Sequence, residues 1–459
     1  MATTGCGQNT ITRRLRIVLL ILIAVGVGRL VWRVGSDAMH FSVNFRPIFL
    51  ASVAWGREQN PYAPASIRTV WSEVRGANDQ SVAELFDRTT NGVPDFWNDT
   101  PPVYPPTSLV VVWPLTVLSW PAARVIWLGL NVLLSGLAWA AAVNLVGLRL
   151  TDWRALLLGA IWSQLGPFAT CVRLGNPAAQ AVALSVLGIW CGWKRRDLCA
   201  GALIGLAAAL KPQIGGVFIV YFAVTRRFTA AGVSVALLAL ITAIGAARLA
   251  HVPWLESFRG NLQATSMAGA TNDPSTANPK RWQMVNLQYP LHTFLDNRML
   301  VTGIAWIFTA AAGLVYLRLL WAAGSNRPEM LVAGIPALLC LLPVYHRYYD
   351  ALLMVIPLGW AASLLYPAIP GKSARRMAIA VLICSAPFYV SWPWALNQLA
   401  VAGRVPQWIL NSWWWNGILM LSQCWALLIM LTCLLIALAG YASQSGGKSD
   451  ESRYTVQQS

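Results

Sequence analysis

The feature that most restricts what this chain can fold into is a series of apolar runs, each long enough to cross a lipid bilayer. They recur from residue 17 to residue 438. About 20 apolar residues cross the hydrocarbon core as one helix, because a helix pairs its own backbone polar groups where no water is available. Only 11% of the residues are charged, against about 25% in an ordinary soluble domain. We therefore expect an all-α polytopic membrane protein rather than several soluble domains.

The basic residues predict how the chain crosses the membrane. The formal net charge is +17, which in a soluble protein would indicate nucleic acid as a partner. In a membrane protein, Lys and Arg collect instead in the cytoplasmic connections. An even number of crossings must then separate any two basic clusters, which lie at residues 13–16, 149–154, 194–196, 226–227, 327 and 372–376. This condition predicts about twelve crossings, both termini in the cytoplasm, a cell (inner) membrane location and no nucleic-acid partner.

The same topology divides the chain into segments. Arg13, Arg14 and Arg16 precede the first apolar run, and no small-residue cleavage site follows them. That run is therefore expected to be a retained anchor and not a signal peptide. The polar C-terminal residues have the composition of a disordered segment. We predict a cytoplasmic N-terminus (1–16), a transmembrane domain (17–440) with external loops 34–106 and 251–298, and a disordered cytoplasmic tail (441–459).

The first external loop is the most acidic part of the chain. Residues 37–106 hold eight of the seventeen carboxylates. The apolar run that follows, 107–119, is about 13 residues long and contains Pro114, which is short for a crossing of about 20 residues. We interpret this run as an interfacial or re-entrant helix, and we expect the loop to cover an active site built on the membrane bundle.

Polar clusters between the apolar runs gather on the same external side. They lie at residues 173–180, 211–213 and 345–350. Lys211 stands directly before Pro212, and proline breaks a helix, so residues 198–225 are expected to form two short helices that meet there. Polar and ionisable groups at membrane depth are costly and are usually functional or paired. Their collection on one face predicts a single site.

Other features favour structure over chemistry. The eight cysteines are scattered and form no C-x-x-C pair, so we interpret them as small buried hydrophobes. His and Asp show no ligand spacing typical of a metal centre, and we expect no metal and no cofactor. Several of the 24 tryptophans fall near predicted external ends. They are typical of an aromatic belt at the interface, with a stacking platform for a sugar or an isoprenoid as the alternative.

Several motifs, taken in order, resemble those of a known family. They are Asn60-Pro61-Tyr62, Tyr104-Pro105-Pro106, Arg173-Leu-Gly175-Asn176-Pro177, Leu210-Lys211-Pro212-Gln213, Asn286-Leu-Gln288 and His346-Arg347-Tyr348-Tyr349-Asp350. Together they resemble the polyprenyl-phosphate-sugar-dependent glycosyltransferases of family 87, which have the GT-C membrane fold and include bacterial mannosyltransferases. The resemblance covers most of residues 37–367. It implies a GT-C-like bundle of about twelve transmembrane helices, whose long first external loop carries interfacial helices.

The resemblance also implies a reaction. A sugar, either mannose or another hexose or pentose, would move from a polyprenyl-phosphate donor to a lipid or glycan acceptor at the external face. The departing phosphate needs cations to offset its charge, and arginine can bind it through two parallel hydrogen bonds. Within the last motif, Asp350 is available to pair with Arg347. The substrate-binding residues implied are Tyr104, Arg173, Asn176, Lys211, Gln288, His346, Arg347 and Asp350.

An inverting transfer also needs a catalytic base that takes the proton of the acceptor hydroxyl. The family pattern implies an aspartate for this role, just outside the first span. When Val43 is aligned with the valine of that pattern, His40 stands in the place of the aspartate. Asp37, three residues earlier, is our first candidate for the base, followed by His40 and Asp99. The departure from the pattern leaves open a catalytically inactive relative of the family.

A second class of function stays open, namely a membrane transporter or lipid flippase. That class predicts internal repeats and polar residues near mid-span in both halves, and neither is evident in the sequence. No segment resembles a Gly-rich nucleotide-sugar domain, which argues against a nucleotide-sugar donor.

Overall fold

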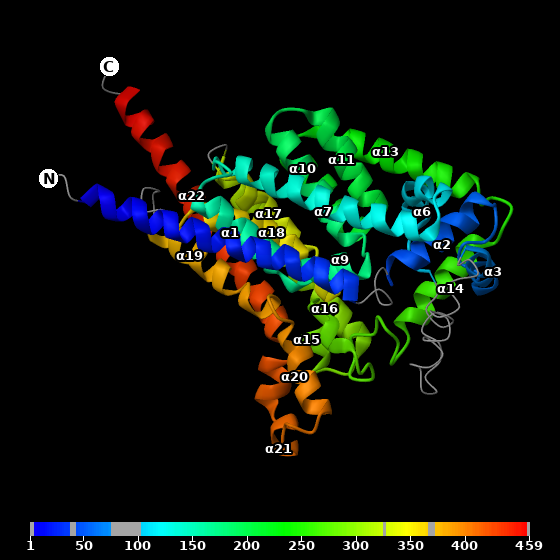
Figure 1. The fold of residues 1–459 in the computed structure, drawn as a ribbon. Helices are drawn as coiled ribbons and strands as arrows, with labels where there is room; N and C mark the ends of the chain where they lie inside the picture. The colour runs from blue at the N-terminus through cyan, green and yellow to red at the C-terminus, as the bar shows by residue number, and fades with distance from the viewer. Residues whose placement is uncertain (1–3, 37–42, 75–101, 325–326, 366–371, 457–459) are drawn as a thin grey trace.

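The computed structural model describes residues 4–36, 43–74, 102–324, 327–365 and 372–456. These residues are helical or form turns, apart from one isolated antiparallel bridge between Met284 and Arg347. The expected all-α class is therefore confirmed for this part of the chain. The first and last helices, α1 (Thr4–Ser36) and α22 (Ser422–Val456), begin and end the bundle, and both termini lie at the same end of it (Figure 1).

Six helical segments of the described chain are long and apolar enough to cross a membrane. A seventh candidate is the pair α8 (Trp153–Gln164) and α9 (Gly166–Leu174), which is bent by 51°. The expectation of about twelve crossings is not confirmed. The six lie in α1, α7 (Trp120–Leu145), α13 (Phe228–Ala247), α16 (Arg298–Ala322), the combined α19 (Lys372–Ile383) and α20 (Trp392–Val401), and α22.

The shortfall arises from helices that are apolar but short. At 1.5 Å per residue, a helix of 13 residues is about 20 Å long, less than the hydrocarbon core of about 30 Å. Their many buried side chains pack against neighbouring helices inside the bundle. The helices concerned are α10 (Ala178–Trp193), α11 (Asp197–Leu210), α12 (Pro212–Val224) and α17 (Glu329–Leu339), followed by η4 (Tyr348–Met354) and α18 (Val355–Ser363).

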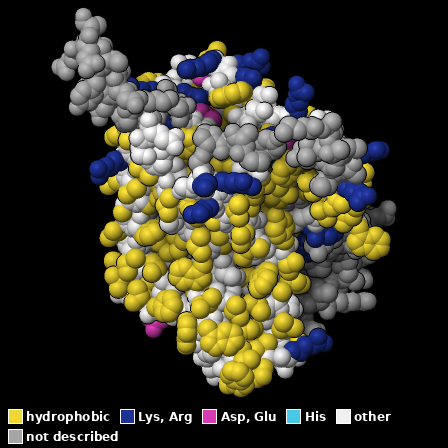
Figure 2. Space-filling model, turned by 90° about the vertical axis from the view of Figure 1, so that its left-hand side faces the viewer, with side chains coloured by type: hydrophobic (Ala, Val, Ile, Leu, Met, Phe, Trp, Pro, Cys, Tyr) yellow, Lys and Arg dark blue, Asp and Glu magenta, His cyan; other side chains and the backbone are white. Residues whose placement is uncertain are grey.

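The outer surface of the bundle is apolar in the way expected of a protein surrounded by lipid. Large hydrophobic side chains are exposed on several long helices, among them Val31 of α1, Val125 of α7 and Ile307 of α16. On the face drawn in Figure 2, hydrophobic side chains form a broad area, and Lys and Arg lie mainly along its upper part and right edge. Proteins in water rarely expose an apolar surface of this extent. The fold therefore supports a membrane protein.

The first long loop contributes short helices that pack onto the bundle. They are α2 (Phe45–Gly56), α3 (Pro64–Val74), α6 (Pro106–Val112) and the 3-10 turn η2 (Trp113–Val117). Phe45 stacks between Trp120 and Trp127 of α7, with ring centroids 5.7 and 4.4 Å away. Residues 106–117 form a short apolar helix, α6 followed by η2, and the prediction that this helix is interfacial or re-entrant stays a prediction.

The second long loop packs against the first. It contains α14 (Trp254–Ser266), the turn η3 (Arg281–Gln283) and α15 (Gln288–His292). Asn261 of α14 donates hydrogen bonds to the carbonyls of Tyr62 and Pro102, at 3.0 and 3.1 Å. Helices α2, α3, α6 and α14 gather at the end of the molecule opposite the termini (Figure 1). Both loops therefore cover one end of the bundle.

The C-terminal helix differs from the expected organisation. The predicted disordered tail begins at residue 441, whereas α22 continues to Val456. Once a helix has formed, each further residue adds one hydrogen bond, so an apolar span can extend into a polar sequence. Before it, the chain leaves the bundle through η5 (Ala386–Phe388), α20, α21 (Gln407–Leu410) and the π-helical turn η6 (Trp415–Leu419). In Figure 1, α20 and α21 project below the rest of the bundle.

The predicted break at Lys211 is confirmed. Lys211 is extended, with φ −151° and ψ 90°, because the proline that follows disfavours the helical conformation. The last carbonyls of α11 would otherwise be left without donors. Thr107 Oγ1 donates to the Ala209 carbonyl at 2.8 Å, and Ser108 Oγ donates to the Ala209 and Leu210 carbonyls at 3.0 Å. The start of α6 therefore holds the end of α11 and fixes the position of Lys211.

A glycine pair beside this break gives a direct test of the packing. A Cβ added at Gly215 would collide with the backbone of Ala207 and Ala208, whereas one at Gly216 meets nothing within 4 Å. We expect Gly215→Val to destabilise the protein by at least ~2 kcal/mol, as overpacking does, and Gly216→Val to fold like wild type. Thermal unfolding in detergent measures both. Equal melting temperatures for the two variants would contradict the close contact between α11 and α12.

Candidate functional site

Three segments that are distant in the sequence meet at a buried ion pair. Lys211 Nζ, at the break between α11 and α12, pairs with the carboxylate of Asp350 at the start of η4. The side chains of Lys211 and Asp350 are only 6% and 1% exposed. Lys211 Nζ also donates to Oδ1 of Asn176, which precedes α10, at 3.3 Å. Two buried charges of opposite sign need each other, because either one alone would be buried without a counter-charge.

Asp350 has further hydrogen-bond partners. His346 Nδ1 lies 3.1 Å from Asp350 Oδ2, and the backbone N–H of Arg347 donates to the same oxygen at 3.3 Å. The latter contact caps the first turn of η4. Burial alone would raise the pKa of Asp350, but the charge of Lys211 and the hydrogen bond from His346 outweigh it and hold this pKa below its ordinary value. Asp350 is therefore a carboxylate at neutral pH.

The expected pairing of Asp350 with the Arg347 side chain is wrong. The Arg347 guanidinium points to the second long loop, where Nη2 donates to the carbonyl of Thr271 at 2.9 Å and to its Oγ1 at 2.5 Å. Of the groups of Arg347, only the backbone N–H donates to Asp350. The other oxygen of Asp350 is bound by the Lys211 ammonium. The ion pair therefore joins different helices instead of two neighbours in one motif.

The second loop holds Arg347 from two sides. Asp273 closes the turn around Thr271, accepting from the Gly269 N–H at 2.8 Å and from the Ser275 hydroxyl at 2.5 Å. Gly269 has φ +80°, a conformation that favours glycine. On the other side, the Val285 N–H donates to the His346 carbonyl at 3.1 Å, next to the bridge between Met284 and Arg347. Residues 284–287 and 342–347 therefore run side by side over the site.

Tyrosine side chains line the same cluster. Lys211 Nζ lies 4.7 Å from the ring centroid of Tyr349, within the range of a cation–π contact. Burial, followed by the nearby Tyr349 and Asp350, raises the pKa of Tyr104 well above its ordinary value. Tyr62 Oη donates to the Tyr104 carbonyl at 2.9 Å. The aromatic rings limit water around the charged groups, and this strengthens their electrostatic interactions.

The remaining residues predicted for the site differ in their positions. Gln288 Nε2 donates to the Pro343 carbonyl at 3.1 Å, so Gln288 supports the backbone that leads to His346. Arg173 is partly buried in the last turn of α9, three residues before Asn176. The three candidates for the catalytic base, Asp37, His40 and Asp99, lie outside the described residues. The structure thus brings together Tyr104, Asn176, Lys211, His346, Arg347 and Asp350.

The cluster has the composition of an anion-binding site. It combines the cations of Lys211 and Arg347 with a single carboxylate. His346 is fully buried, and its Nε2, like Arg347 Nε, has no protein hydrogen-bond partner. Buried polar atoms normally have partners, so these two nitrogens are available to a bound phosphate or hydroxyl. Within the described residues, no group of three or more His, Cys, Asp or Glu side chains is placed to hold a metal ion.

Two residues of this site were not found from the sequence. Tyr349 lies in the quoted motif at residues 346–350, but nothing in the pattern says that its ring faces Lys211. Thr271 lies in a polar loop without a distinguishing motif, and only the fold brings it to Arg347.

The ion pair predicts a specific pattern of stability. Asp350→Ala leaves the Lys211 ammonium buried without its carboxylate, and we expect a loss of about 3–5 kcal/mol in the free energy of unfolding. The double variant Lys211→Met with Asp350→Leu removes both charges and should recover most of this loss while lacking activity. Thermal unfolding of Lys211→Met, of Asp350→Leu and of the double variant measures the coupling. Strictly additive losses would contradict a direct pair.

The same pair predicts a dependence of stability on pH. Because the folded pKa of Asp350 lies below its ordinary value of 3.8, the stabilisation is complete above that value and is lost as the pH falls below it. Asp350→Asn should lack this acidic component, whereas wild type should show it. Unfolding profiles below about pH 5 that are identical for both proteins would contradict this.

Comparison with known proteins identifies a family for the chain. The sequence profile of glycosyltransferase family 87 matches residues 103–345, more than half of the chain. The matched segment includes Tyr104, Arg173, Asn176, Lys211 and Gln288, and it ends directly before His346. No curated protein and no solved structure matches the chain. Since the profile covers more than half of the chain, the chain belongs to glycosyltransferase family 87.

Proposed function

We propose that this protein transfers a sugar from a polyprenyl-phosphate carrier to a lipid or glycan acceptor, with inversion at the anomeric carbon. Membership of the family implies glycosyltransferase activity. The observation that carries the finer proposal is the buried cluster of Lys211, His346, Arg347 and Asp350. Its excess of positive charge, enclosed by aromatic rings, suits a phosphate that becomes more negative as the sugar leaves it.

The residues of the cluster have different roles in this proposal. Lys211 acts as a point charge, shared between Asp350 and the incoming phosphate. Arg347, held by Thr271, uses the rest of its guanidinium to donate to phosphate oxygens. Asp350 keeps Lys211 and His346 in position, and His346 Nε2 contacts the phosphate or the acceptor hydroxyl. Arg173 and Asn176 complete the phosphate-binding side.

A carboxylate from the first external loop serves as the catalytic base. It takes the proton of the acceptor hydroxyl as that oxygen attacks the anomeric carbon and the bond from this carbon to the phosphate oxygen breaks. Among the carboxylates of this loop, Asp37 stands nearest to the position where the family places an aspartate. It is therefore the first candidate, ahead of His40, which occupies that position in the alignment, and of Asp99. The products are the glycosylated acceptor and the polyprenyl phosphate.

The proposed donor is compatible with a site inside a membrane bundle. A polyprenyl chain remains in the bilayer while its phosphate and sugar reach the end of the bundle that the two loops cover. The distribution of Lys and Arg supports an external position for this end, with both termini in the cytoplasm of a cell whose inner membrane holds the protein. Mannose is the first sugar to test, followed by other hexoses and pentoses.

Two alternatives have specific support. A transporter or flippase would use the same lipid-facing helices, but it predicts polar groups near mid-span in both halves. An inactive GT-C relative is favoured by His40, which stands where the family pattern has an aspartate. Transfer of sugar by the purified protein distinguishes both from the enzyme.

The assignment of the base is tested by transfer of radiolabel from a polyprenyl-phosphate sugar. We expect Asp37→Asn to lower kcat by about 10²–10⁴-fold, the range that a positioned general base contributes. His40→Ala should have a smaller effect. Full transfer by both variants would contradict the assignment of the base to this segment. No transfer by wild type from mannosyl, other hexosyl or pentosyl donors would favour the transporter or the inactive relative.

The role of Arg347 is tested by a substitution that keeps its charge. Arg347→Lys removes the planar fork and the two contacts to Thr271, so kcat/KM for the donor should fall by roughly tenfold or more, equivalent to one charge-assisted hydrogen bond. Arg259→Lys, at an exposed position of α14 in the same loop, is the matched control and should behave like wild type. Equal activity of the two variants would show that the Arg347 fork does not bind the donor.

A further inference from the structure

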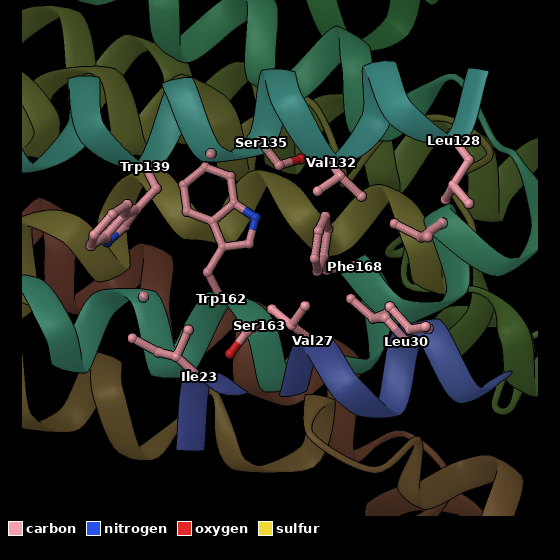
Figure 3. A pocket seen from close by; sticks show the side chains of 14 residues that line it. Ile23, Val27, Leu30, Leu128, Val132, Ser135, Trp139, Trp162, Ser163 and Phe168 are labelled. Carbon is pink, nitrogen blue, oxygen red and sulfur yellow. The ribbon is translucent and has the colours of Figure 1, made fainter. Parts of the chain in front are cut away.

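A deep apolar groove separates α1 from α7. Helix α1 packs along α8 and also contacts α9, whereas α7 packs mainly on α10, so α1 and α7 stand apart as the two walls. The floor is formed by α8 and α9, including Trp162 and Phe168, whose rings lie between the walls (Figure 3). The cavity has a volume of about 310 Å³, within the range of about 300–1,000 Å³ typical of ligand sites.

The groove is long and nearly free of polar groups. It extends from Leu30 and Leu128 at one end to Ile23 and Trp139 at the other (Figure 3). Trp139 lies eleven positions after Leu128, which corresponds to roughly 16 Å along α7. Its polar side-chain groups belong to Ser135, Trp139, Trp162 and Ser163. Trp139 Nε1 and the Ser163 hydroxyl donate to backbone carbonyls of α8. Such a shape suits an extended hydrocarbon chain.

One end of the groove reaches the candidate site through α9. Phe168 and Val172, one turn apart on this helix, line the groove. Cys171, which lies between Phe168 and Val172 in the sequence, faces the other way, and its Sγ donates to the Tyr349 carbonyl at 3.6 Å. Helix α9 is therefore a shared wall, with the groove on one face and the segment at 346–350 on the other.

The bend between α8 and α9 fixes this shared wall. Pro167 stands in the first turn of α9, and the two helices meet at Gly166. A Cβ at Gly166 would collide with the Tyr348 hydroxyl, which donates to the Phe388 carbonyl at 2.8 Å. Tyr348 belongs to η4, whose first turn contains Asp350. The floor of the groove and the phosphate-binding residues are thus anchored to the same element.

We propose that this groove binds the prenyl chain of the polyprenyl-phosphate donor. The inference rests on the proposed function and names the part of the protein that holds the lipid half of that substrate. A chain in the groove leaves it beside Val172, so that the phosphate attached to it arrives next to Arg173 and the Lys211 cluster. Burial of a hydrocarbon chain against these walls contributes about 25 cal/mol per Å² of apolar surface.

The walls also favour an isoprenoid over a saturated acyl chain. Trp162 Nε1 and the Ser135 hydroxyl are buried in the groove without a protein partner. An N–H group gains weakly from contact with π electrons, and the repeated double bonds of an isoprenoid supply them, whereas a saturated chain does not. The rings of Trp139, Trp162 and Phe168 offer broad apolar surfaces to its methyl groups.

Two glycines on α7 provide a matched test. Gly136 lines the groove, Gly129 does not, and a side chain at either position meets nothing within 4 Å. Gly136→Phe therefore fills the groove without disturbing the packing, and Gly129→Phe is the control. For a donor of ten or more isoprene units, we expect Gly136→Phe to raise KM by roughly tenfold with kcat unchanged, since a few lost methylene contacts suffice. A two-isoprene donor should show a change below about twofold in either variant.

The possible outcomes distinguish a failure of the groove proposal from a failure of the proposed function. An equal rise in KM for both donors, or no rise with the long donor, overturns the groove as the site of the prenyl chain. If wild type transfers no sugar from any donor, the proposed function fails, and the groove is then judged by binding alone. A polyprenyl phosphate that carries a diazirine on its chain should label residues 128–139 or 159–172 in wild type and in Gly129→Phe, but not in Gly136→Phe. Labelling elsewhere, or equal competition by a diacyl phospholipid, overturns the inference.

Discussion

The ion pair between Lys211 and Asp350 is the interaction on which the rest of the site depends. Both charges are removed from water, a state that is tolerated only when each has its partner and further hydrogen bonds. Asn176 and His346 supply those bonds. To satisfy the pair, the break after α11, the start of α10 and the start of η4 must lie together. Neighbouring contacts hold these segments in place. The Thr107 and Ser108 hydroxyls bind the end of α11, and Thr271 binds Arg347 before η4.

Much of this site could be predicted from the sequence, because its residues depart from the apolar pattern of the helices around them. Proline after Lys211 must interrupt a helix, and five polar or aromatic residues at 346–350 are unusual between two apolar runs. The partners could not be predicted, since Asp350 has a cation beside it in the sequence and yet binds one 139 residues away. Thr271 and Tyr349 gain their roles only from tertiary contacts. Whether Asp37, His40 or Asp99 is the base stays a prediction, because all three lie outside the described residues.

The all-α class was predicted from the sequence, but the number of helices long enough to cross the membrane was not. Counting basic clusters predicts the side on which a connection lies, but apart from residues 107–119 it treats the apolar runs as full crossings. Helices such as α11 and α12 are short and meet at a buried break, and many of their side chains are covered by protein. An apolar composition alone does not distinguish a helix surrounded by lipid from one surrounded by other helices. The expected short helix after Pro106 was recognised because its length and Pro114 both argue against a span.

The proposed lipid-borne donor would use both the apolar groove and the charged cluster, since α9 carries the groove on one face and contacts the segment at 346–350 on the other. The central claim, that the Lys211 cluster binds the donor phosphate, is tested most directly by a cryo-EM structure with a non-transferable polyprenyl phosphonate-sugar analogue. The account predicts phosphonate oxygens within hydrogen-bond distance, about 2.7–3.2 Å, of Lys211 Nζ and Arg347. A headgroup bound elsewhere, with the pair between Lys211 and Asp350 undisturbed and remote from it, would contradict the account.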